Sequence, residues 1–262
     1  MAEAIARSIV SSGTVAAAQV IASNPSSPRR EVFASFGCKT TTDNTEVAAN
    51  SDIIFLCVKP QISPLVFPQL TALTEKQTLV SVMAGKNIAW MRSQLPADCK
   101  CSIVRVMPNT PLLISEGACG IAYPESTAKE TVLQIKALLK PSSLVVEDVA
   151  ESSMDAVTAV SGSGPAYVFR FLEAMIAAGE EEGLSAEVAS RLAIQTVLGA
   201  GRLAQHANRT NTGTVAELRT RVTSKGGTTQ AALDKMEELG LYATVKQGVH
   251  AAAARSRELQ QQ

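Results

Sequence analysis

The pattern of apolar and polar positions changes character near residue 150. Before that point, short β-branched runs alternate with segments of helical length and spacing. The runs Ile53–Val58 and Thr78–Met83 are apolar on both faces, which is typical of strands covered by helices on each side. Such alternation predicts right-handed crossovers and a parallel, doubly wound sheet. The predicted strands are Gln19–Ser23, Lys39–Thr41, Ile53–Val58, Thr78–Met83, Ser102–Met107 and Leu144–Glu147, and the predicted helices are Met1–Ser12, Thr45–Asn50, Ile62–Leu73 and Ile88–Leu95.

After about Glu151 the strand pattern stops and long alanine-rich helical segments follow. In Gly164–Glu182, apolar residues recur at three- and four-residue spacing and make one continuous apolar face. Such faces exceed what a bundle of this size covers alone, which indicates a partner subunit. We therefore predict an α/β domain over residues 1–150 and an all-helical domain over residues 151–262. The predicted helices of the second domain are Ser153–Val160, Gly164–Glu182, Ser185–Ala207, Thr214–Val222, Thr228–Leu239 and Tyr242–Leu259.

Composition and charge narrow the classes of function. The 262 residues are 46% hydrophobic and 18% charged, and 24 basic side chains balance 24 acidic ones. This balance gives no net field for nucleic acid or an anionic membrane. The five cysteines show no Cys-x-x-Cys spacing, so we expect no metal site. No apolar run is long enough for a membrane span and no export signal is present, so we expect a cytoplasmic protein.

Three predicted strand ends suggest a dinucleotide site, because doubly wound sheets bind ligands beyond the carboxyl ends of their strands. The segment Ser23–Arg30 lacks the Asp or Glu that would bind the ribose hydroxyls of NAD, and it offers hydroxyl, amide and guanidinium groups instead. These groups suit a 2′-phosphate, so NADPH is the expected cofactor, with NADH possible. Lys59-Pro60 and Ala84-Gly85 follow the next two buried strands, and the small Ala84-Gly85 pair allows close approach of a nicotinamide ring. Taken singly, these segments also fit a solvated Pro/Ser turn and a surface lysine.

The pattern lacks one part of the expected Rossmann-like fold. Such a fold opens with a buried strand and a Gly-x-Gly-x-x-Gly/Ala turn that leads into the first helix. Here the first predicted helix starts at Met1. A missing central strand would leave its two neighbours without ladder partners. We expect Met1 to be an internal methionine and the true start to lie about ten to fifteen residues upstream, judged from ordinary strand and turn lengths.

Two glycine-containing loops in the second domain each run into a helix. Ser161–Tyr167 places Pro165 in a first helical turn, where free backbone N–H groups can hold a ligand. Val222–Thr229 combines the hydroxyls of Ser224, Thr228 and Thr229 with the pair Gly226-Gly227, which makes a nest suited to a carboxylate. A tight interhelical turn and a solvated helix cap are the simpler interpretations of these loops.

With these motifs, nearly the whole chain strongly resembles the pyrroline-5-carboxylate reductase family. Met1–Ile5 is similar to the end of the family's glycine turn, and the loops Ser161–Tyr167 and Val222–Thr229 are the most specific matches. Lys225 departs from the family pattern, in which proline is commoner at this position. Further matching segments are Ala22–Pro25, Val58–Pro60, Val106–Pro111 and Glu116-Gly117.

The resemblance implies hydride transfer from NAD(P)H to C5 of 1-pyrroline-5-carboxylate, which gives L-proline in the last step of proline biosynthesis. It also implies a helical dimerisation domain, a homodimer and possibly a larger ring of dimers. Ser224 and Thr229 are the expected catalytic residues, with the Thr229 hydroxyl near the ring nitrogen. The expected substrate-binding residues are Ser224, Gly226, Gly227, Thr228 and Thr229, and the expected cofactor-binding residues are Met1, Ala2, Ser23, Asn24, Asn44, Cys57, Val58, Lys59, Pro60, Ala84, Gly85, Asn109 and Ser163.

Two alternatives stay open. One is another reductase on the same architecture, which would act on a hydroxy acid or on a different imine. A hydroxy-acid enzyme would usually place a lysine base in the first long helix after the sheet, and Gly164–Glu182 contains no lysine. A non-catalytic chain would keep only the assembly role of the helical domain, because the glycine turn is missing. His206 and His250 lie in helical segments away from every motif, so we interpret both as structural.

Overall fold

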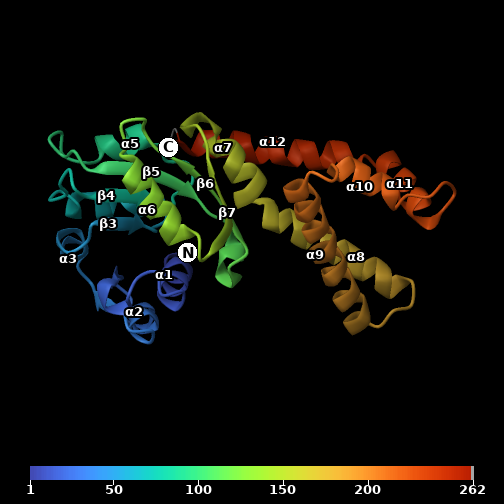
Figure 1. Cartoon of the computed structure of the whole chain (residues 1–262), viewed down its shortest axis with the longest axis horizontal. Coiled ribbons are helices and arrows are strands. Elements are labelled where there is room, and N and C mark those ends of the chain that lie inside the picture. The colour runs from blue at the N-terminus through green and yellow to red at the C-terminus, as the bar shows by residue number, and fades with distance from the viewer. Residues whose placement is uncertain (261–262) are drawn as a thin grey trace. The chain divides into compact units, whose positions relative to one another are not determined.

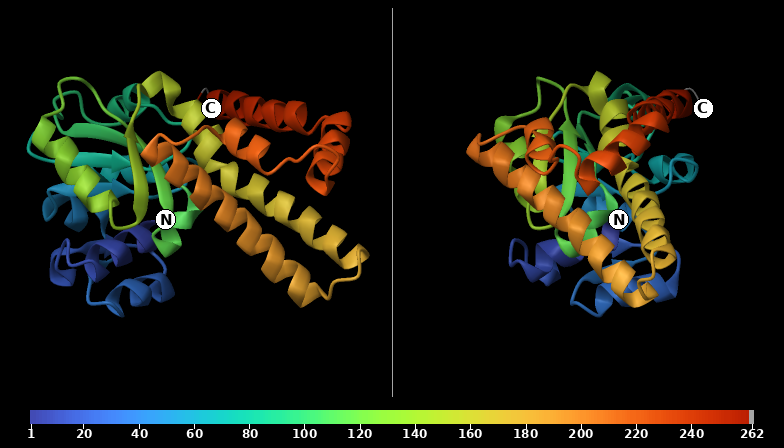
Figure 2. Two further views of the ribbon diagram at one scale, coloured as in Figure 1. Left: turned by 45° about the vertical axis from the view of Figure 1, so that its right-hand side comes forward. Right: turned by 90° about the vertical axis from the view of Figure 1, so that its right-hand side faces the viewer.

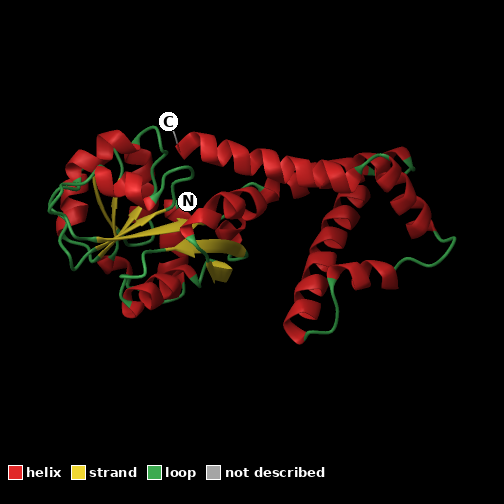
Figure 3. Cartoon of the chain, turned by 90° about the horizontal axis from the view of Figure 1, so that it is seen from above, coloured by secondary structure: helices red, strands yellow, loops and turns green. Residues whose placement is uncertain are grey.

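The computed structural model describes residues 1–260. The chain forms two compact units, of which the first comprises Met1–Pro165 with His250–Gln262 and the second comprises Ala166–Val249. Every β-strand lies in the first unit, whereas the second is built from helices (Figure 3). This mixed α/β and all-helical organisation agrees with the predicted fold class.

The main sheet of the first unit has five strands in the order β3-β4-β5-β6-β7 (Figure 1). The pairs β3/β4, β4/β5 and β6/β7 are parallel, but β5 and β6 are antiparallel. The prediction of a purely parallel sheet is therefore wrong at β6. Strand β6 itself was also absent from the predicted strands. A short 3₁₀ connection, Thr110–Ile114, returns the chain beside β5, and short connections favour antiparallel pairing. The strands are β3 Ile53–Leu56, β4 Thr78–Ser81, β5 Ser102–Met107, β6 Gly117–Ala122 and β7 Ser143–Asp148.

A second, two-stranded sheet stands apart from the main one. It pairs β1 (Ile21–Ser23) with β2 (Lys39–Thr41) in parallel, with Ala22 opposite Thr40. Within the described residues, β1 and β3 are thus end strands of separate sheets. This is the arrangement expected when the strand that normally lies between them is absent, and it agrees with a Rossmann-like sheet that lacks its first strand.

Alternating side chains of the main sheet enter two cores. On one face, Ile54, Leu79 and Ile103 pack with Phe67 and Met91. On the other face, residues such as Val80 and Val104 pack against helix α6. This alternation follows from the two-residue period of a strand and gives each helical layer its own apolar surface. Leu79 and Val80 both have 0% exposure, so the sheet unit possesses a complete interior of its own.

Helix α1 joins this interior next to α6. Ala4, Ile5 and Ile9 pack against Phe55 and Val82 of the main sheet. The other face of α1 contacts the small sheet and α2 through Ala6 and Phe33. The helices of the first unit are α1 Ala2–Ser11, α2 Ser27–Ala34, α3 Asn44–Ala49, α4 Ser63–Val66, α5 Ile88–Ser93, α6 Lys129–Leu139 and α7 Met154–Val157.

The helices of this unit depart from the predicted ones in three places. Helix α2 was missed, because its start at Ser27-Pro28 looks like a turn although proline suits a first helical turn. Helix α6 was also missed. The predicted helix Ile62–Leu73 shrinks to α4 and a 3₁₀ turn over Phe67–Gln69, since Pro68 lacks the N–H that would continue α4.

The helical unit is dominated by two long helices, α8 (Gly164–Glu181) and α9 (Ala186–Thr210), which lie side by side in Figure 2. Small residues bring them together, because a Cβ atom on Gly179 would lie 3.2 Å from the Cβ atom of Ala189. The remaining helices are α10 Val215–Arg221, α11 Thr228–Glu238 and α12 Leu241–Gln260, whose last residues belong to the first unit.

The apolar face predicted on Gly164–Glu182 is largely uncovered. Helix α8 has no buried residue, and Val168 and Phe171 are 43% and 41% exposed. A continuous exposed apolar face of this kind marks an interaction surface in a water-soluble domain. None of the helices within residues 1–260 combines the length and the apolar character needed to cross a membrane.

Candidate functional site

The loop that follows β1 is held in shape by its own polar groups. The Asn24 side chain accepts a hydrogen bond of 2.9 Å from the Ser26 backbone N–H, and Arg30 donates to the carbonyls of Asn24 and Pro25 at 2.7 and 2.9 Å. Arg29 reaches Glu3 in the first turn of α1 at 3.0 Å. Thus the end of β1, which includes the predicted Ser23 and Asn24, lies beside the start of α1. The loop presents hydroxyl, amide and guanidinium donors, the set that a phosphate requires.

Glu3 lies in the first turn of α1 and pairs with Arg29 of the segment after β1. Hydrogen bonds from Arg7 and Arg29 hold the pKa of its carboxyl below the usual range, so it is ionised at neutral pH. Its charge is shared between two guanidinium groups, and both contacts are solvent-exposed. Because exposed pairs contribute little, Arg29 can turn towards a phosphate at small cost. The sequence analysis did not predict the Glu3–Arg29 pair, although an acidic residue in a first helical turn is a typical site for such a contact.

The structure brings two predicted cofactor segments together where β3 ends. Ile5, in the first turn of α1, packs in one cluster with Phe55 of β3. Desolvation raises the pKa of the Cys57 thiol to about 12. The thiol stays protonated at neutral pH, so Cys57 contributes packing and backbone groups rather than a nucleophile. Ala2 packs with the small cluster around Phe33.

The remaining residues of the β3 end are ordered by backbone contacts. Val58 packs against the main core, whereas Lys59 is exposed and its carbonyl accepts the Ile62 and Ser63 N–H groups. Ser63 donates its hydroxyl to the carbonyl of Pro60 at 2.7 Å. The Asn44 amide at the start of α3 donates to Gln69 at 3.1 Å. Both segments are thus held by the connection that follows β3.

The predicted pair Ala84-Gly85 lies in the loop after β4, and Gly85 is packed against the end of the chain. Gly85 has a φ of +68°, and a Cβ atom there would lie 2.8 Å from the Cβ atom of Leu259. Glycine is therefore required by both the backbone conformation and the close contact. The sequence analysis predicted that this small pair allows a nicotinamide ring to approach. In the structure, the small Gly85 also allows the last turn of α12 to pack against the loop.

Asn109, which follows β5, connects three segments of the first unit. Its side-chain oxygen Oδ1 accepts the Ala118 N–H at 2.9 Å, and its side-chain Nδ2 donates to the Ser161 hydroxyl at 3.4 Å. Ser161 in turn donates to the carbonyl of Ala118 at 3.4 Å. Ser163 closes the neighbouring π-helical turn through its N–H to Thr158 at 2.8 Å. The loop Ser161–Tyr167 is thus anchored to the sheet, and Asn109 has a clear structural role.

The predicted substrate loop lies wholly in the helical unit. Ser224 to Gly227 form a turn, in which the Gly227 N–H donates to the Ser224 carbonyl at 3.0 Å. Gly226 has a φ of +72°, a conformation that favours glycine, and a Cβ atom on Gly227 would lie 2.7 Å from the Ser224 hydroxyl oxygen, which would then have to move. Lys225 occupies the second turn position, where proline is favoured in general, which explains why either residue fits.

Helix α11 begins at this turn without a side-chain cap. Gly227 is the residue before the helix, and Thr228 and Thr229 form its first two positions. Their backbone N–H groups have no intrahelical partner, and they point out of the helix start together with the positive end of its dipole. Ser224 and Thr228 are exposed and Thr229 is half-buried. The loop therefore offers N–H and hydroxyl donors for a carboxylate.

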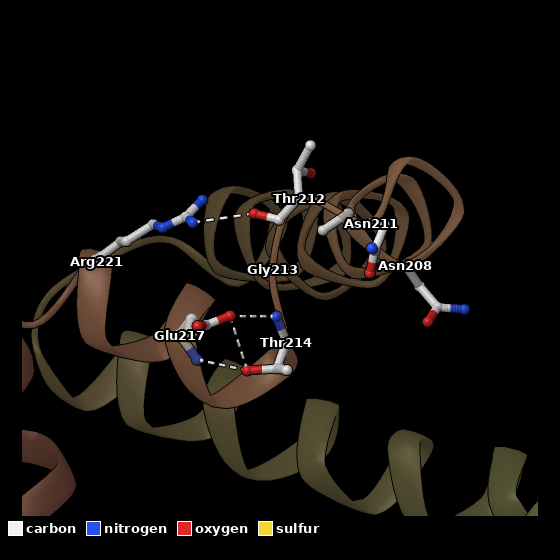
Figure 4. Close-up of a pocket in the computed structure, with 8 residues that line it drawn as sticks. Asn208, Asn211, Thr212, Gly213, Thr214, Glu217 and Arg221 are labelled. Atoms are coloured by element: carbon white, nitrogen blue, oxygen red, sulfur yellow. Dashed lines mark hydrogen bonds between the residues drawn. The ribbon is translucent and has the colours of Figure 1, made fainter.

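One cavity in the helical unit does not include any predicted site residue. It measures about 400 Å³ and lies where α9 connects to α10 (Figure 4). Thr214 and Glu217 form a capping box there, and Arg221 donates to the Thr212 carbonyl at 3.0 Å. Its polar groups are used in local capping, so we assign it no chemistry. Nor do three His, Cys, Asp or Glu side chains gather as metal ligands anywhere in residues 1–260.

Comparisons with known proteins agree with this division of the chain. Residues 151–259 match the family described as pyrroline-5-carboxylate reductase dimerisation, and residues 1–85 match NADP oxidoreductase coenzyme F420-dependent. The chain is 40% identical to a pyrroline-5-carboxylate reductase of Pseudomonas aeruginosa, over 95% of this chain and 89% of that protein. It is 35% identical to the Synechocystis enzyme of the same name, over 99% and 94%.

Solved structures show the same relationship. The structure of a pyrroline-5-carboxylate reductase from Coxiella burnetii aligns with a TM-score of 0.88 and 32% identity, over 98% of this chain and 94% of that one. The NADP-bound Plasmodium falciparum pyrroline carboxylate reductase aligns with a TM-score of 0.87 and 28% identity, over 98% and 93%. With fold, loop motifs and relatives in agreement, the chain belongs to the pyrroline-5-carboxylate reductase family.

Proposed function

We propose that this chain reduces 1-pyrroline-5-carboxylate to L-proline with NADPH as the preferred cofactor, as the last step of proline biosynthesis. The observation that carries the proposal is the 40% identity to a pyrroline-5-carboxylate reductase over 95% of the chain. The uncapped glycine turn at the start of α11 supports it with a carboxylate-binding geometry. NADH is a possible second cofactor.

The substrate supplies its own electrophile, because a protonated C=N bond accepts a hydride without a strong acid, metal or nucleophile. The protein's task is therefore mainly positioning, which can lower a barrier by several kcal/mol. The N–H groups of Thr228 and Thr229 and the Ser224 hydroxyl hold the carboxylate, with Gly226 and Gly227 giving the loop its shape. The Thr229 hydroxyl donates to, or accepts from, the ring nitrogen.

The groups at the strand ends fit a dinucleotide phosphate. The segment after β1 offers hydroxyl, amide and guanidinium donors and no carboxylate of its own apart from Glu31 in α2. Arg30 and Arg29 suit a 2′-phosphate, and Ser23, Asn24 and Asn44 suit the adenine-side ribose. When bound, the cofactor supplies the hydride. The other residues proposed to contact it are Met1, Ala2, Cys57, Val58, Lys59, Pro60, Ala84, Gly85, Asn109 and Ser163.

The assembly that we propose is a homodimer, with a ring of dimers as a possible larger form. The exposed apolar faces of α8 and α9 support it. We place the nucleotide domain at residues 1–150 and the substrate and dimerisation domain at residues 151–262. All five cysteines are free, which supports a reducing compartment such as the cytoplasm.

Steady-state turnover of 1-pyrroline-5-carboxylate tests the proposal. The assay follows the loss of NADPH or NADH absorbance and identifies the product as L-proline by chromatography. We expect substrate-dependent oxidation with both cofactors and a higher kcat/KM with NADPH. Absence of proline formation with either cofactor would overturn the proposed reaction, and a preference for NADH would overturn the role given to Arg29 and Arg30.

A further inference from the structure

The loop between β4 and α5 is held by residues that lie far away in the chain. This loop contains Ala84-Gly85, the pair proposed to contact the cofactor. Its local contacts lie at its far end, where Asn87 accepts the Trp90 N–H at 2.7 Å and the Lys86 ammonium lies 4.4 Å from the centre of the Trp90 ring. These contacts order the start of α5, and they involve neither residue of the pair.

Glu151 is the first distant anchor of this loop. Its Oε1 accepts the Ile88 N–H, the first N–H of α5, at 2.6 Å. This N–H has no acceptor within its own helix, so Glu151 satisfies it. The same oxygen accepts from Arg105 Nη1 at 3.3 Å, and the Arg105 side chain is 4% exposed. Because Arg105 lies in β5, these contacts tie the start of α5 to the main sheet.

The last turn of α12 is the second distant anchor. A Cβ atom on Gly85 would lie 2.8 Å from the Cβ atom of Leu259, so the loop and this turn are in direct contact. Asp155 holds the turn, because its carboxylate accepts the Ser256 hydroxyl at 2.6 Å and the Gln260 side-chain amide at 2.8 Å. Asp155 and Ser256 are buried, where the loss of a hydrogen-bond partner is costly.

Both anchors depend on one short segment that follows β7. Glu151 begins the 3₁₀ turn Glu151–Ser153, and Asp155 lies in α7, which comes directly after it. Glu151 reaches the loop at the start of α5, and Asp155 reaches it through Leu259. Two neighbouring carboxylates therefore hold the loop from two sides.

We propose that Glu151 and Asp155 are positioning residues for hydride transfer. Neither has to contact the cofactor, because they fix the place of Ala84-Gly85, against which the nicotinamide ring lies. Hydride transfer depends steeply on this geometry, since a displacement of about 1 Å can lower a rate roughly 100-fold. The effect on the rate rests on the proposed reductase function, whereas the anchoring of the loop does not.

Amide hydrogen exchange of the full chain, read by mass spectrometry, tests the anchoring. Glu151→Ala removes the acceptor of the Ile88 N–H, so peptides over residues 84–90 should exchange faster. Asp155→Ala releases the last turn of α12, so peptides over residues 252–260 should exchange faster. We expect an increase of about tenfold or more in each case, the loss of one hydrogen bond to a charged group. Unchanged exchange in both variants would overturn the proposal.

Single-turnover kinetics test the effect on hydride transfer. Each chain is saturated with NADPH and mixed rapidly with excess 1-pyrroline-5-carboxylate, and the loss of NADPH fluorescence gives a rate constant. Unfolded chain lowers the amplitude and not the rate constant, which separates positioning from folding. We expect Glu151→Ala and Asp155→Ala each to lower the rate constant about tenfold or more. Glu151→Gln and Asp155→Asn keep an acceptor oxygen, so they should stay within about threefold of the unmodified chain.

Leu259→Gly gives a second route to the same measurement. It removes the side chain that contacts Gly85 and keeps both carboxylates, so it should reproduce the slowing even if Asp155→Ala does not fold. Asp148→Ala is the matched control, because Asp148 ends β7 and pairs with Lys136 of α6 rather than with the loop. It should leave the rate constant unchanged.

Two kinetic results would also overturn the inference. One is an unchanged rate constant in Glu151→Ala, Asp155→Ala and Leu259→Gly. The other is equal slowing by Asp148→Ala, which would mean that any lost carboxylate of this region has the same effect. An unmodified chain that binds NADPH without reducing the substrate would contradict the proposed function instead, and the exchange experiment would then decide alone whether the loop is anchored.

Discussion

The two units of the chain differ in how they use apolar side chains. The sheet unit buries large residues such as Phe67, Leu79 and Ile135 almost completely. In Ala166–Val249, by contrast, the buried residues are only Ala189, Ala193 and Ala207. The sheet unit therefore has a large buried apolar core. The helical unit instead has apolar faces that no other element of the unit covers. The match of residues 151–259 to a dimerisation family agrees with this exposure, because a partner subunit would cover such faces.

The two units also differ in the kind of site that the sequence predicts in each. The predicted cofactor segments all lie at strand and helix ends of the sheet unit, where a rigid interior fixes them. The predicted substrate loop lies in the unit that depends on assembly for its burial. The predicted substrate loop would therefore depend on assembly, whereas the predicted cofactor segments lie in the unit that has the larger buried interior.

The largest expected effect comes from charging the uncovered helical face. Phe171→Glu with Leu198→Glu places carboxylates on side chains that are 41% and 43% exposed in the single chain. We expect dissociation to monomers and loss of reductase activity, because a dimer interface does not tolerate unpaired buried charges. Light scattering after gel filtration gives the mass, and the turnover assay gives the activity.

Leu133→Glu is the matched control, since Leu133 is 66% exposed in α6 of the sheet unit. It should keep the mass and activity of the unmodified chain. The proposed interface is wrong if the double variant keeps its mass, or if Leu133→Glu dissociates the chain as well.

The substrate loop gives the next largest effect. Ser224→Ala and Thr229→Val each remove one hydroxyl proposed to contact the substrate. We expect kcat/KM for 1-pyrroline-5-carboxylate to fall roughly 10- to 100-fold per variant, the value of a hydrogen bond to a charged group. Thr212→Val is the control, because the Thr212 hydroxyl contacts Thr210 at 2.8 Å in the same unit. Unchanged kcat/KM in both loop variants would refute these roles.

Removing Arg30 tests the sheet unit in the same way. Arg30→Ala should raise the KM for NADPH roughly tenfold and leave the KM for NADH nearly unchanged, because only NADPH carries the 2′-phosphate. Arg255→Ala, on the exposed turn beside Glu258, is the control. Equal effects of Arg30→Ala on both cofactors would mean that the arginine only shapes the loop through Asn24 and Pro25.

The smallest effect is expected in alkaline solution, and it reports on the sheet unit alone, which contains all five cysteines. Burial raises the pKa of Cys57 to about 12 and that of Cys101 to about 11, from an ordinary value of 9.0. Raised pKa values favour the folded state below the ordinary value. That stabilisation is lost as the pH rises through the window between about 9 and the folded values.

Denaturant unfolding at several alkaline pH values measures this loss. We expect the free energy of unfolding to fall above about pH 9, and to fall less in a chain with Cys57→Ala and Cys101→Ala. An equal fall in both chains would assign the alkaline sensitivity to other groups.

Sequence patterns predicted much of this architecture, and their failures have physical causes. Strands β2 and β5 have the predicted bounds, because their β-branched and apolar residues favour the extended conformation. Strand β6 was missed because Gly117-Ala118-Cys119-Gly120 carries little strand propensity. It owes its conformation to its neighbours, since a Cβ atom on Gly120 would lie 2.8 Å from Val157.

The candidate sites divide in the same way. The loop Val222–Thr229 was visible in the sequence because its glycines and hydroxyls are contiguous. The contact between Asn109 and Ser161 was not, because the two residues come from separate elements that only the fold brings together.

The most direct test compares the unmodified chain with the double variant Ser224→Ala, Thr229→Val in one experiment. NADPH binding is measured by fluorescence, and the initial rate of NADPH oxidation is measured with 1-pyrroline-5-carboxylate. We predict equal NADPH affinity for both chains, turnover to L-proline by the unmodified chain, and a rate at least about 100-fold lower for the double variant. Equal rates in the two chains, or an unmodified chain that binds NADPH without reducing the substrate, would contradict the account.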